Sequence, residues 1–199
     1  MNVVEQVYLS NNSAPTRRMP DQQLADIDFW ARQRLIVNVL EIGFNAGQFA
    51  QRFLAANKHA RVTSFGTENA PNVAAHRRLG NRHTMVIGDP ATSVHHSAHS
   101  KRRTRFDLIF INIDNYNAVI ATIMNCTKLA HRNTVIILND VVTGSPNGPT
   151  RAWKKMVDDK VLVKYGTKQY GKDYGMAIGR FELCAVEPEN RICQQIKTQ

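Results

Sequence analysis

The segment Glu41–Gly47 is the first part of the sequence whose residue types could serve chemistry. It reads Glu-Ile-Gly-Phe-Asn-Ala-Gly, follows the apolar run 37–40 and precedes helical spacing from Gln48 onward. Glycines at such a junction let the backbone approach a ligand without an intervening side chain. The first amides of the helix can then bind a carboxylate. The glycine spacing differs from that of a dinucleotide site, so the segment predicts a binding turn for another ligand or an ordinary strand–turn–helix junction.

Polar side chains also follow three other apolar runs. They are Asp89 after residues 84–87, Asn112 and Asp114 after residues 106–111, and Asn139 with Asp140 after residues 134–138. Carboxylates in such positions can act as general bases or bind cations. Three clustered histidines lie in a polar segment and are expected to be solvated: His95, His96 and His99.

The spacing of apolar residues predicts strands that alternate with helices. Strands are expected at residues 37–43, 61–65, 84–87, 106–111 and 134–138, and helices at residues 21–34, 48–56, 71–79, 116–130 and 150–159. The run 106–111 is nearly all apolar, as in a central parallel strand buried on both faces. Two later strands, 161–165 and 175–181, are expected to pair antiparallel.

This order of elements predicts an α/β fold. We expect a Rossmann-like, doubly wound sheet of seven strands, mostly parallel with one antiparallel strand near the C-terminus. Ligands of such sheets bind beyond the carboxyl ends of the strands. The turn at 41–47 and the polar residues after the other strands should therefore meet at one edge of the sheet.

Composition narrows the class of protein. A chain of 199 residues suits one domain, and no apolar stretch approaches the roughly 20 residues that a membrane helix needs. The three cysteines, Cys126, Cys184 and Cys193, suit neither a disulfide framework nor a zinc site. Because the N-terminus lacks the pattern of a secretory signal, a reducing, cytoplasmic location is expected.

The chain is strongly basic, with a net charge of +10 and an isoelectric point of about 9.9. Such a charge favours anionic partners, nucleic acid among them. The lysines and arginines concentrate in residues 77–105 and 151–172. Basic patches for a phosphate-rich partner and ordinary solvated faces of surface helices both explain this pattern.

Taken together, the motifs resemble those of class I methyltransferases that depend on S-adenosylmethionine (SAM), and within them the small O-methyltransferase-like domains that include catechol-type enzymes. The segments that carry this resemblance are residues 39–47, 106–116 and 135–141, and residues 148–153 and 175–179 also agree with it. The resemblance implies an N-terminal extension at 1–20, a SAM-dependent methyltransferase domain at 21–186 and a polar tail at 187–199.

The resemblance also implies which residues bind the cofactor. Glu41 and the turn residues Gly43, Phe44, Asn45 and Gly47 would hold the methionine end of SAM. An acid after the second strand would bind the ribose, but Gly66 stands there and Glu68 is the nearest acid. Asp89 would lie by the adenine or cap the next helix. The resemblance also implies that Asn112 binds the cofactor.

A divalent metal is not expected. Metal-dependent relatives carry an acid after the fourth strand and an Asp-Asn or Asp-Asp pair after the fifth. This chain has Asn112 at the first position and Asn139-Asp140 at the second. Loss of carboxylates weakens a magnesium site, so these side chains are expected to make only hydrogen bonds to loop backbone instead.

Three functions follow from the resemblance. The first is methyl transfer to an oxygen or nitrogen of an unidentified acceptor, a small molecule or RNA, with Asp114 and then Asp140 as the polar groups at the transfer site. The second is RNA ribose 2′-O-methylation through a Lys-Asp-Lys-Glu set, for which Asp114, Lys154 or Lys155, and Glu182 occur in order without the first lysine. The third is a domain that binds a ligand or partner without catalysis. Oligomeric state is not indicated.

Overall fold

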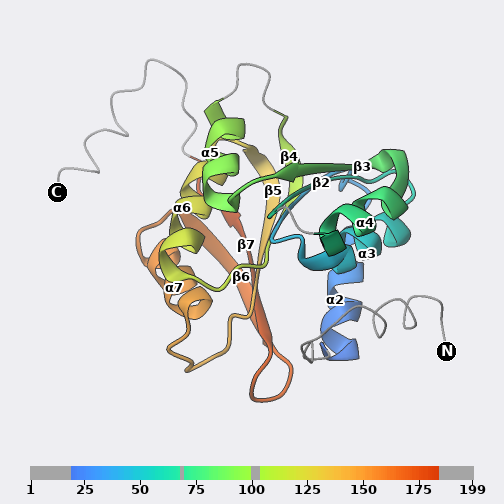
Figure 1. The fold of residues 1–199 in the computed structure, drawn as a ribbon. Helices are drawn as coiled ribbons and strands as arrows, with labels where there is room; N and C mark the ends of the chain where they lie inside the picture. Colours follow the sequence, from blue (N-terminus) through green and yellow to red (C-terminus); the bar gives the residue numbers. More distant parts are fainter. Residues whose placement is uncertain (1–18, 68–69, 100–103, 184–199) are drawn as a thin grey trace.

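A seven-stranded sheet forms the centre of the molecule in the computed structural model, which describes residues 19–67, 70–99 and 104–183 (Figure 1). The strand order is β3-β2-β1-β4-β5-β7-β6. The strands are β1 (Asn38–Ile42), β2 (Arg61–Gly66), β3 (His83–Ile87), β4 (Phe106–Ile111), β5 (Ala130–Asn139), β6 (Leu162–Gln169) and β7 (Gly175–Phe181). The first five strands are parallel, and β7 is antiparallel to both of its neighbours. This confirms the predicted fold class.

Helices cover both faces of the sheet (Figure 1). They are α2 (Asp21–Ala31), α3 (Gln48–Ala56), α4 (Ala70–Leu79), α5 (Pro90–His99), α6 (Tyr116–Cys126) and α7 (Gly148–Asp158), with two short 3-10 turns, η1 (Asn45–Gly47) and η2 (Gly80–Arg82). One hydrophobic cluster joins α2, α3 and α4 to the sheet, and another joins α5, α6 and α7 to its other face. None of the helices in the described ranges has the length and apolar character that crossing a membrane requires.

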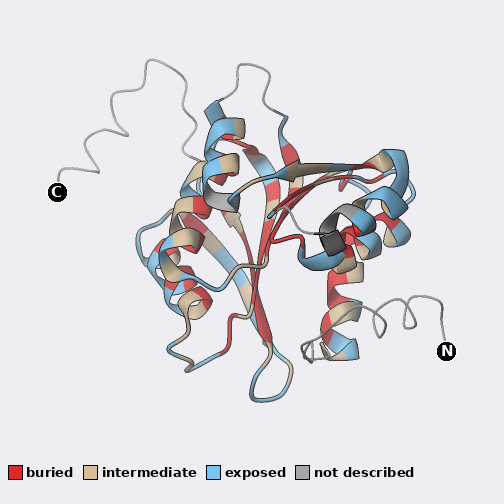
Figure 2. Cartoon of the chain, viewed as in Figure 1, coloured by how far each residue is buried: buried red, intermediate tan, exposed pale blue. Residues whose placement is uncertain are grey.

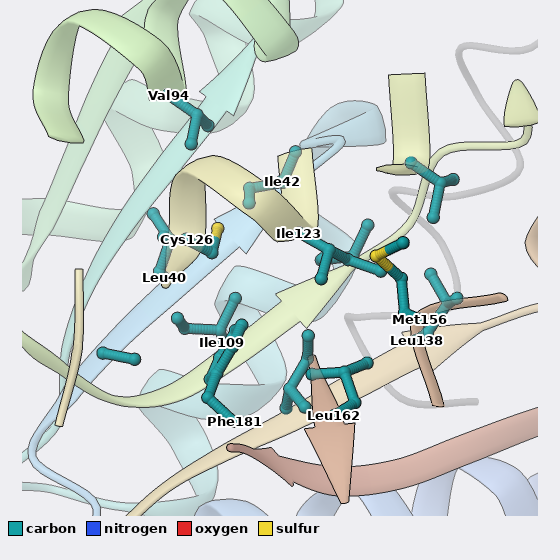
Figure 3. Close-up of a cluster of buried hydrophobic side chains, with 14 of the residues drawn as sticks. Leu40, Ile42, Val94, Ile109, Ile123, Cys126, Leu138, Met156, Leu162 and Phe181 are labelled. Atoms are coloured by element: carbon teal, nitrogen blue, oxygen red, sulfur yellow. The ribbon is translucent and has the colours of Figure 1, made fainter. Parts of the chain in front are cut away.

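The central strands are buried on both faces because each supplies alternate side chains to the two clusters. In β4, Ile109 and Ile111 pack towards α5 and α6, whereas Leu108 and Phe110 pack towards α2 and α3. Figure 3 shows the cluster that joins α5, α6 and α7 to the sheet, around Ile109 and Ile123, and Figure 2 shows how burial concentrates along the sheet. This explains why residues 106–111 read as a nearly unbroken apolar run.

The predicted helix at 116–130 is too long. It ends at Cys126, and the amides of Lys128 and Leu129 close a turn onto the carbonyls of Asn125 and Cys126. Leu129 is buried on this turn rather than on the helix, and Ala130 already pairs with Phe106 as the start of β5. A buried position follows the helix at helical spacing, so apolar periodicity does not mark the boundary. The helix predicted at 21–34 likewise ends earlier, at Ala31.

Candidate functional site

The carboxyl ends of β1, β4 and β5 lie next to one another. Ile42 pairs with Ile111, which in turn pairs with Leu138. The segments that follow these residues therefore share one edge of the sheet, which we call the carboxyl edge. The backbone links them directly, because the amide of Asn112 donates to the carbonyl of Ile42 at 2.7 Å. The structure thus brings the 41–47 turn together with Asn112 and Asn139, as expected.

The turn after β1 adopts a left-handed backbone over most of its length. The φ angles are +95° at Gly43, +37° at Asn45, +60° at Ala46 and +82° at Gly47. A Cβ atom on Gly43 would lie 2.1 Å from the carbonyl oxygen of Asn112. Gly47 is the N-cap residue of α3 and has no side chain with which to cap it. The turn therefore brings the backbone after β1 close to the backbone after β4 and places the start of α3 at the carboxyl edge.

Phe44 differs from the rest of the turn. Its side chain is 1% exposed and its ring stacks on that of His83, with centroids 5.2 Å apart and an interplanar angle of 18°. A Cβ atom on Gly66 would lie 2.9 Å from Phe44 Cβ. The Phe44 side chain is thus part of the core below the turn, so only its backbone lies where a cofactor was predicted. Its packing also explains why no acid occupies the end of β2.

Glu41 is fully buried on β1, and burial raises its pKa to about 8. Its Oε2 accepts a hydrogen bond from the hydroxyl of Ser64. Ser64 Oγ lies 2.8 Å from His83 Nε2, and His83 Nδ1 lies 2.9 Å from His76 Nδ1. These four residues form a polar chain beneath the turn, which runs from β1 through β2 and β3 to α4. The sequence analysis assigned only Glu41.

A second polar chain consists of amides at the ends of β4 and β5. Asn139 Nδ2 donates to Asn112 Oδ1 at 2.9 Å, and Gln23 Nε2 on α2 donates to Asn139 Oδ1 at 2.7 Å. We call Gln23, Asn139 and Asn112 the amide chain. Asn112 and Asn139 were expected to bond to loop backbone, but they bond to each other. Gln23 was missed because it lies 116 residues from its partner.

The loops that bear Asp114 and Asp140 meet at the start of α7. A Cβ atom on Gly148 would lie 2.1 Å from the Asp114 carbonyl oxygen, and Asn147 Nδ2 donates to the Asp140 carbonyl at 2.9 Å. The Asp114 side chain is exposed there. The guanidinium of Arg151 lies 4.7 Å from the centre of the Tyr116 ring. Both predicted catalytic acids therefore lie at the carboxyl edge, beside an aromatic–cation pair that the sequence analysis left unassigned.

Lys155 lies on the exposed side of α7 and donates to Asp159 at 2.8 Å. That hydrogen bond raises the pKa of Lys155, which keeps the ammonium protonated and opposes a role as base. Lys154 pairs in the same way with Asp158. Lys155, the predicted catalytic lysine, thus forms an ordinary ion pair with Asp159, one helical turn further along the chain.

The Lys-Asp-Lys-Glu set is not assembled. Asp114 follows β4 at the carboxyl edge, whereas Glu182 follows β7 at the opposite edge, where its amide donates to the carbonyl of Val161. The register of β5 with β7 runs from Asn139–Met176 to Val135–Arg180. At about 3.3 Å per residue, the two edges are more than about 13 Å apart. The side chain of Glu182 instead pairs with Arg180 at 3.3 Å.

Two predicted cofactor-binding acids remain. Asp89 Oδ1 accepts from the amide and the hydroxyl of Thr92 at 2.9 and 3.0 Å, so it caps the first turn of α5. Glu68 lies outside the described residues. Within those residues, no three His, Cys, Asp or Glu side chains gather as metal ligands would.

Comparisons with known proteins agree with this geometry. A family model described as a methyltransferase domain matches residues 40–141, about half of the chain. No curated protein sequence matches. An O-methyltransferase from Bacillus cereus in complex with S-adenosylhomocysteine (SAH) superposes with a TM-score of 0.74 at 22% identity, over 90% of this chain and 89% of that one.

Two further solved structures share the fold. An O-methyltransferase of tomaymycin synthesis from Streptomyces achromogenes, in complex with SAM, has a TM-score of 0.70 at 16% identity, over 89% of this chain and 86% of that one. The fibrillarin pre-rRNA processing protein of Methanococcus jannaschii has a TM-score of 0.62 at 15% identity, over 76% of this chain and 69% of that one. The expected fold of class I methyltransferases is confirmed, and the chain belongs to the methyltransferase-domain family.

Proposed function

We propose that this protein binds SAM at the 41–47 turn and transfers its methyl group to an oxygen or nitrogen of a small acceptor, without a divalent metal. The observation that carries the proposal is the close contact of Gly43 with Asn112, which brings the start of α3, where Gly47 provides no capping side chain, to the carboxyl edge. A helix start of this kind suits the carboxylate of the methionine moiety. The family and the SAM and SAH complexes of similar structures support the same cofactor.

The residues of the chain have separable roles in this proposal. Gly43, Asn45 and Gly47 would hold the methionine end, Glu41 would place charge beneath it, and Asp89 and Glu68 would lie towards the nucleoside. When bound, SAM supplies a methyl group on a positively charged sulfur. Asp114 would accept the proton of the attacking group, with Asp140 as the second candidate, because both lie on loops at the carboxyl edge.

The amide chain does not suit a divalent metal. The side-chain oxygens of Asn112 and Asn139 both accept hydrogen bonds, from Asn139 and Gln23 respectively. Magnesium prefers carboxylate and water oxygens in an octahedral array. We therefore expect activity to be retained in excess EDTA, and strict loss that magnesium restores would contradict this.

RNA as the acceptor is the second candidate. The basic charge and the fold shared with fibrillarin favour it, and the separation of Asp114 from Glu182 opposes the Lys-Asp-Lys-Glu mechanism. Gly66 favours the third candidate, a binding domain without catalysis, because the close packing of Phe44 leaves no room for an acidic side chain at the end of β2.

Calorimetric titration with SAM tests the proposal. Asn45 is an exposed residue of the turn, and weaker SAM binding by the Asn45→Trp variant would support the placement. Asn133, an exposed residue of β5 far from the turn, provides the matched control, and Asn133→Trp should leave SAM binding unchanged. Absence of SAM and SAH binding would contradict the function. Methyl transfer to small phenols and to RNA, each with EDTA and with magnesium, then separates the first two candidates, and binding without transfer to any acceptor favours the third.

A further inference from the structure

The buried polar chain beneath the turn contains more ionisable groups than cofactor binding requires. Glu41, Ser64 and His83 lie on the neighbouring strands β1, β2 and β3, His76 lies on α4, and each of the four residues contacts the next. Glu41, Ser64 and His83 are buried, and His76 is partly exposed at the far end. The chain therefore connects a fully buried carboxyl group to the surface.

Each contact in this chain requires one hydrogen, and this restricts the chain to two arrangements. When Glu41 is ionised, it can only accept, so Ser64 donates to it, His83 Nε2–H donates to Ser64, and His76 Nδ1–H donates to His83 Nδ1. When Glu41 is protonated on Oε2, all three bonds reverse. Glu41 then donates to Ser64, Ser64 donates to His83 Nε2, and His83 Nδ1–H donates to His76 Nδ1.

The two arrangements differ by one proton. Uptake of a proton at His76 Nε2, followed by the transfer of one proton along each hydrogen bond, leaves Glu41 neutral and both histidines neutral. The alternative, a proton on Glu41 Oε1, would bury a donor without an acceptor, because no acceptor lies within hydrogen-bond distance of Oε1 among the described residues. Reversal of the chain is therefore the favourable way to protonate Glu41.

We infer that His76, His83, Ser64 and Glu41 form a proton relay, which carries protons between the partly exposed His76 and the buried Glu41 and makes the charge beneath the cofactor turn, and with it the affinity for the methyl donor, depend on pH. The part that concerns the cofactor rests on the proposed function. SAM carries a positive sulfur and SAH does not, so an ionised Glu41 favours SAM over SAH. His83 also couples the relay to the turn mechanically, because its ring stacks on Phe44.

The surroundings of Glu41 support a transition in the physiological range. Burial raises its pKa to about 8, while the Ser64 hydroxyl and the backbone amide of Ala50 on α3 lower it. The ionisable side chains of the relay that lie towards Glu41 are His83 on β3 and His76 on α4, and neither is a cause of this shift. Burial, and then the neighbouring His76, lower the pKa of His83 to about 4, so His83 stays neutral while Glu41 titrates.

Nuclear magnetic resonance of the full-length protein, labelled with 15N at histidine and 13C at glutamate, tests the relay without any ligand. We expect His83 to carry its proton on Nδ1 at pH 6.5 and on Nε2 at pH 9.5, with a midpoint that coincides with the titration of the Glu41 carboxyl. The same tautomer at both pH values would overturn the relay. In Glu41→Gln and Ser64→Ala the tautomer should no longer change, whereas Thr63→Ala, a neighbouring hydroxyl of β2 outside the chain, should keep the change.

Calorimetry of SAM and SAH between pH 7 and pH 9 tests the effect on the cofactor. Both ligands carry the same amino and carboxyl groups, so the ratio of their affinities isolates the charge on sulfur. We expect this ratio to rise in favour of SAM by between about twofold and tenfold, and to stay constant in Glu41→Gln. A constant ratio in the parent protein would overturn the link to the cofactor. If neither ligand binds, the proposed function and the link both fail, and the tautomer measurement alone decides the relay.

Discussion

Burial of Glu41 and His83 makes the stability of the protein depend on pH. The pKa of Glu41 is raised from 4.5 to about 8, so its contribution to stability is complete below pH 4.5 and is lost as the pH rises through 8. The pKa of His83 is lowered from 6.5 to about 4, so its contribution is present above pH 6.5 and is lost as the pH falls through 4. Between pH 4.5 and 6.5, a rise in pH therefore lowers the contribution of Glu41 and raises that of His83.

We therefore expect the melting temperature to be highest between about pH 5 and pH 6, where the two contributions offset each other, and to fall between pH 6.5 and 9. The loss of free energy of unfolding over that interval should be on the order of a few kcal/mol. Glu41→Gln should remove the alkaline decline and leave the acid one. Thermal melts of both proteins across this range make the comparison, and a parallel alkaline decline in the variant would show that other groups cause it.

Gly43 is constrained by its neighbour as well as by its backbone angle. A Cβ atom there would lie 2.1 Å from the Asn112 carbonyl oxygen, whereas Gly144, also with positive φ, has no atom within 4 Å of its own Cβ position. Gly144→Ala should cost about 1 kcal/mol through backbone strain. Gly43→Ala should cost about 1–3 kcal/mol more through overpacking, and should weaken SAM binding. Equal losses in urea denaturation would contradict the steric explanation.

At the scale of elements, α2 is fixed to the sheet by polar contacts at three points. Gln23 reaches β5, Asp28 pairs with Arg52 on α3, and Asp26 accepts from Lys168 at 2.6 Å and from Tyr170 at 2.5 Å. Asp26 is nearly buried, and burial together with its hydrogen bond raises the pKa of Tyr170. The helix therefore joins the carboxyl edge to the β6–β7 hairpin.

Asp26→Asn should lower the free energy of unfolding by about 1–3 kcal/mol, because it leaves partly buried donors with a weaker acceptor. Asp158→Asn offers a matched control on α7, where the exposed pair with Lys154 should contribute less than about 0.5 kcal/mol. Chemical denaturation of both variants measures the difference. Similar small losses would mean that α2 is held by its apolar face alone.

The elements that the sequence predicted well are those with a strong local pattern. The apolar run 106–111 and the glycine turn at 41–47 were placed correctly because periodicity and turn chemistry act over a few residues. The end of α6 was missed because Leu129 continues the helical spacing into a turn. The contact between Gln23 and Asn139 was missed because nothing local marks a contact across 116 residues. The relay was missed for the same reason, since Ser64 and His83 are ordinary residues of their strands.

At the scale of the whole molecule, the basic charge of residues 151–172 does not gather at the carboxyl edge. Lys154, Lys155 and Lys168 each pair with an aspartate, and Lys160 follows α7 at the far end of that helix. Within residues 151–172, all of which the structure describes, only Arg151, beside Tyr116, and the hairpin residue Lys172 lie near the edge without a described aspartate partner. Charge spread in this way suits solubility better than a track for a polyanion.

We therefore expect RNA to bind weakly, and the variants Arg151→Ala/Lys172→Ala and Lys154→Ala/Lys160→Ala to change its affinity by equal, small amounts across salt concentrations. Filter binding of a single-stranded RNA at several salt concentrations provides the comparison. If the first pair alone lowered the salt slope by about 0.7 per lost phosphate contact, RNA would become the better acceptor.

The position of β7 has a consequence for how the chain is made. This strand is the last of the sheet in sequence but lies between β5 and β6. While the protein is being synthesised, β5 keeps an open apolar edge and β6 has no strand to join until residue 181 has left the ribosome. The first five strands can assemble in order of synthesis, whereas the sheet closes in one late step. During that interval the unpaired edge of β5 is exposed to other nascent chains, which makes it the point most open to misassembly and to chaperone binding.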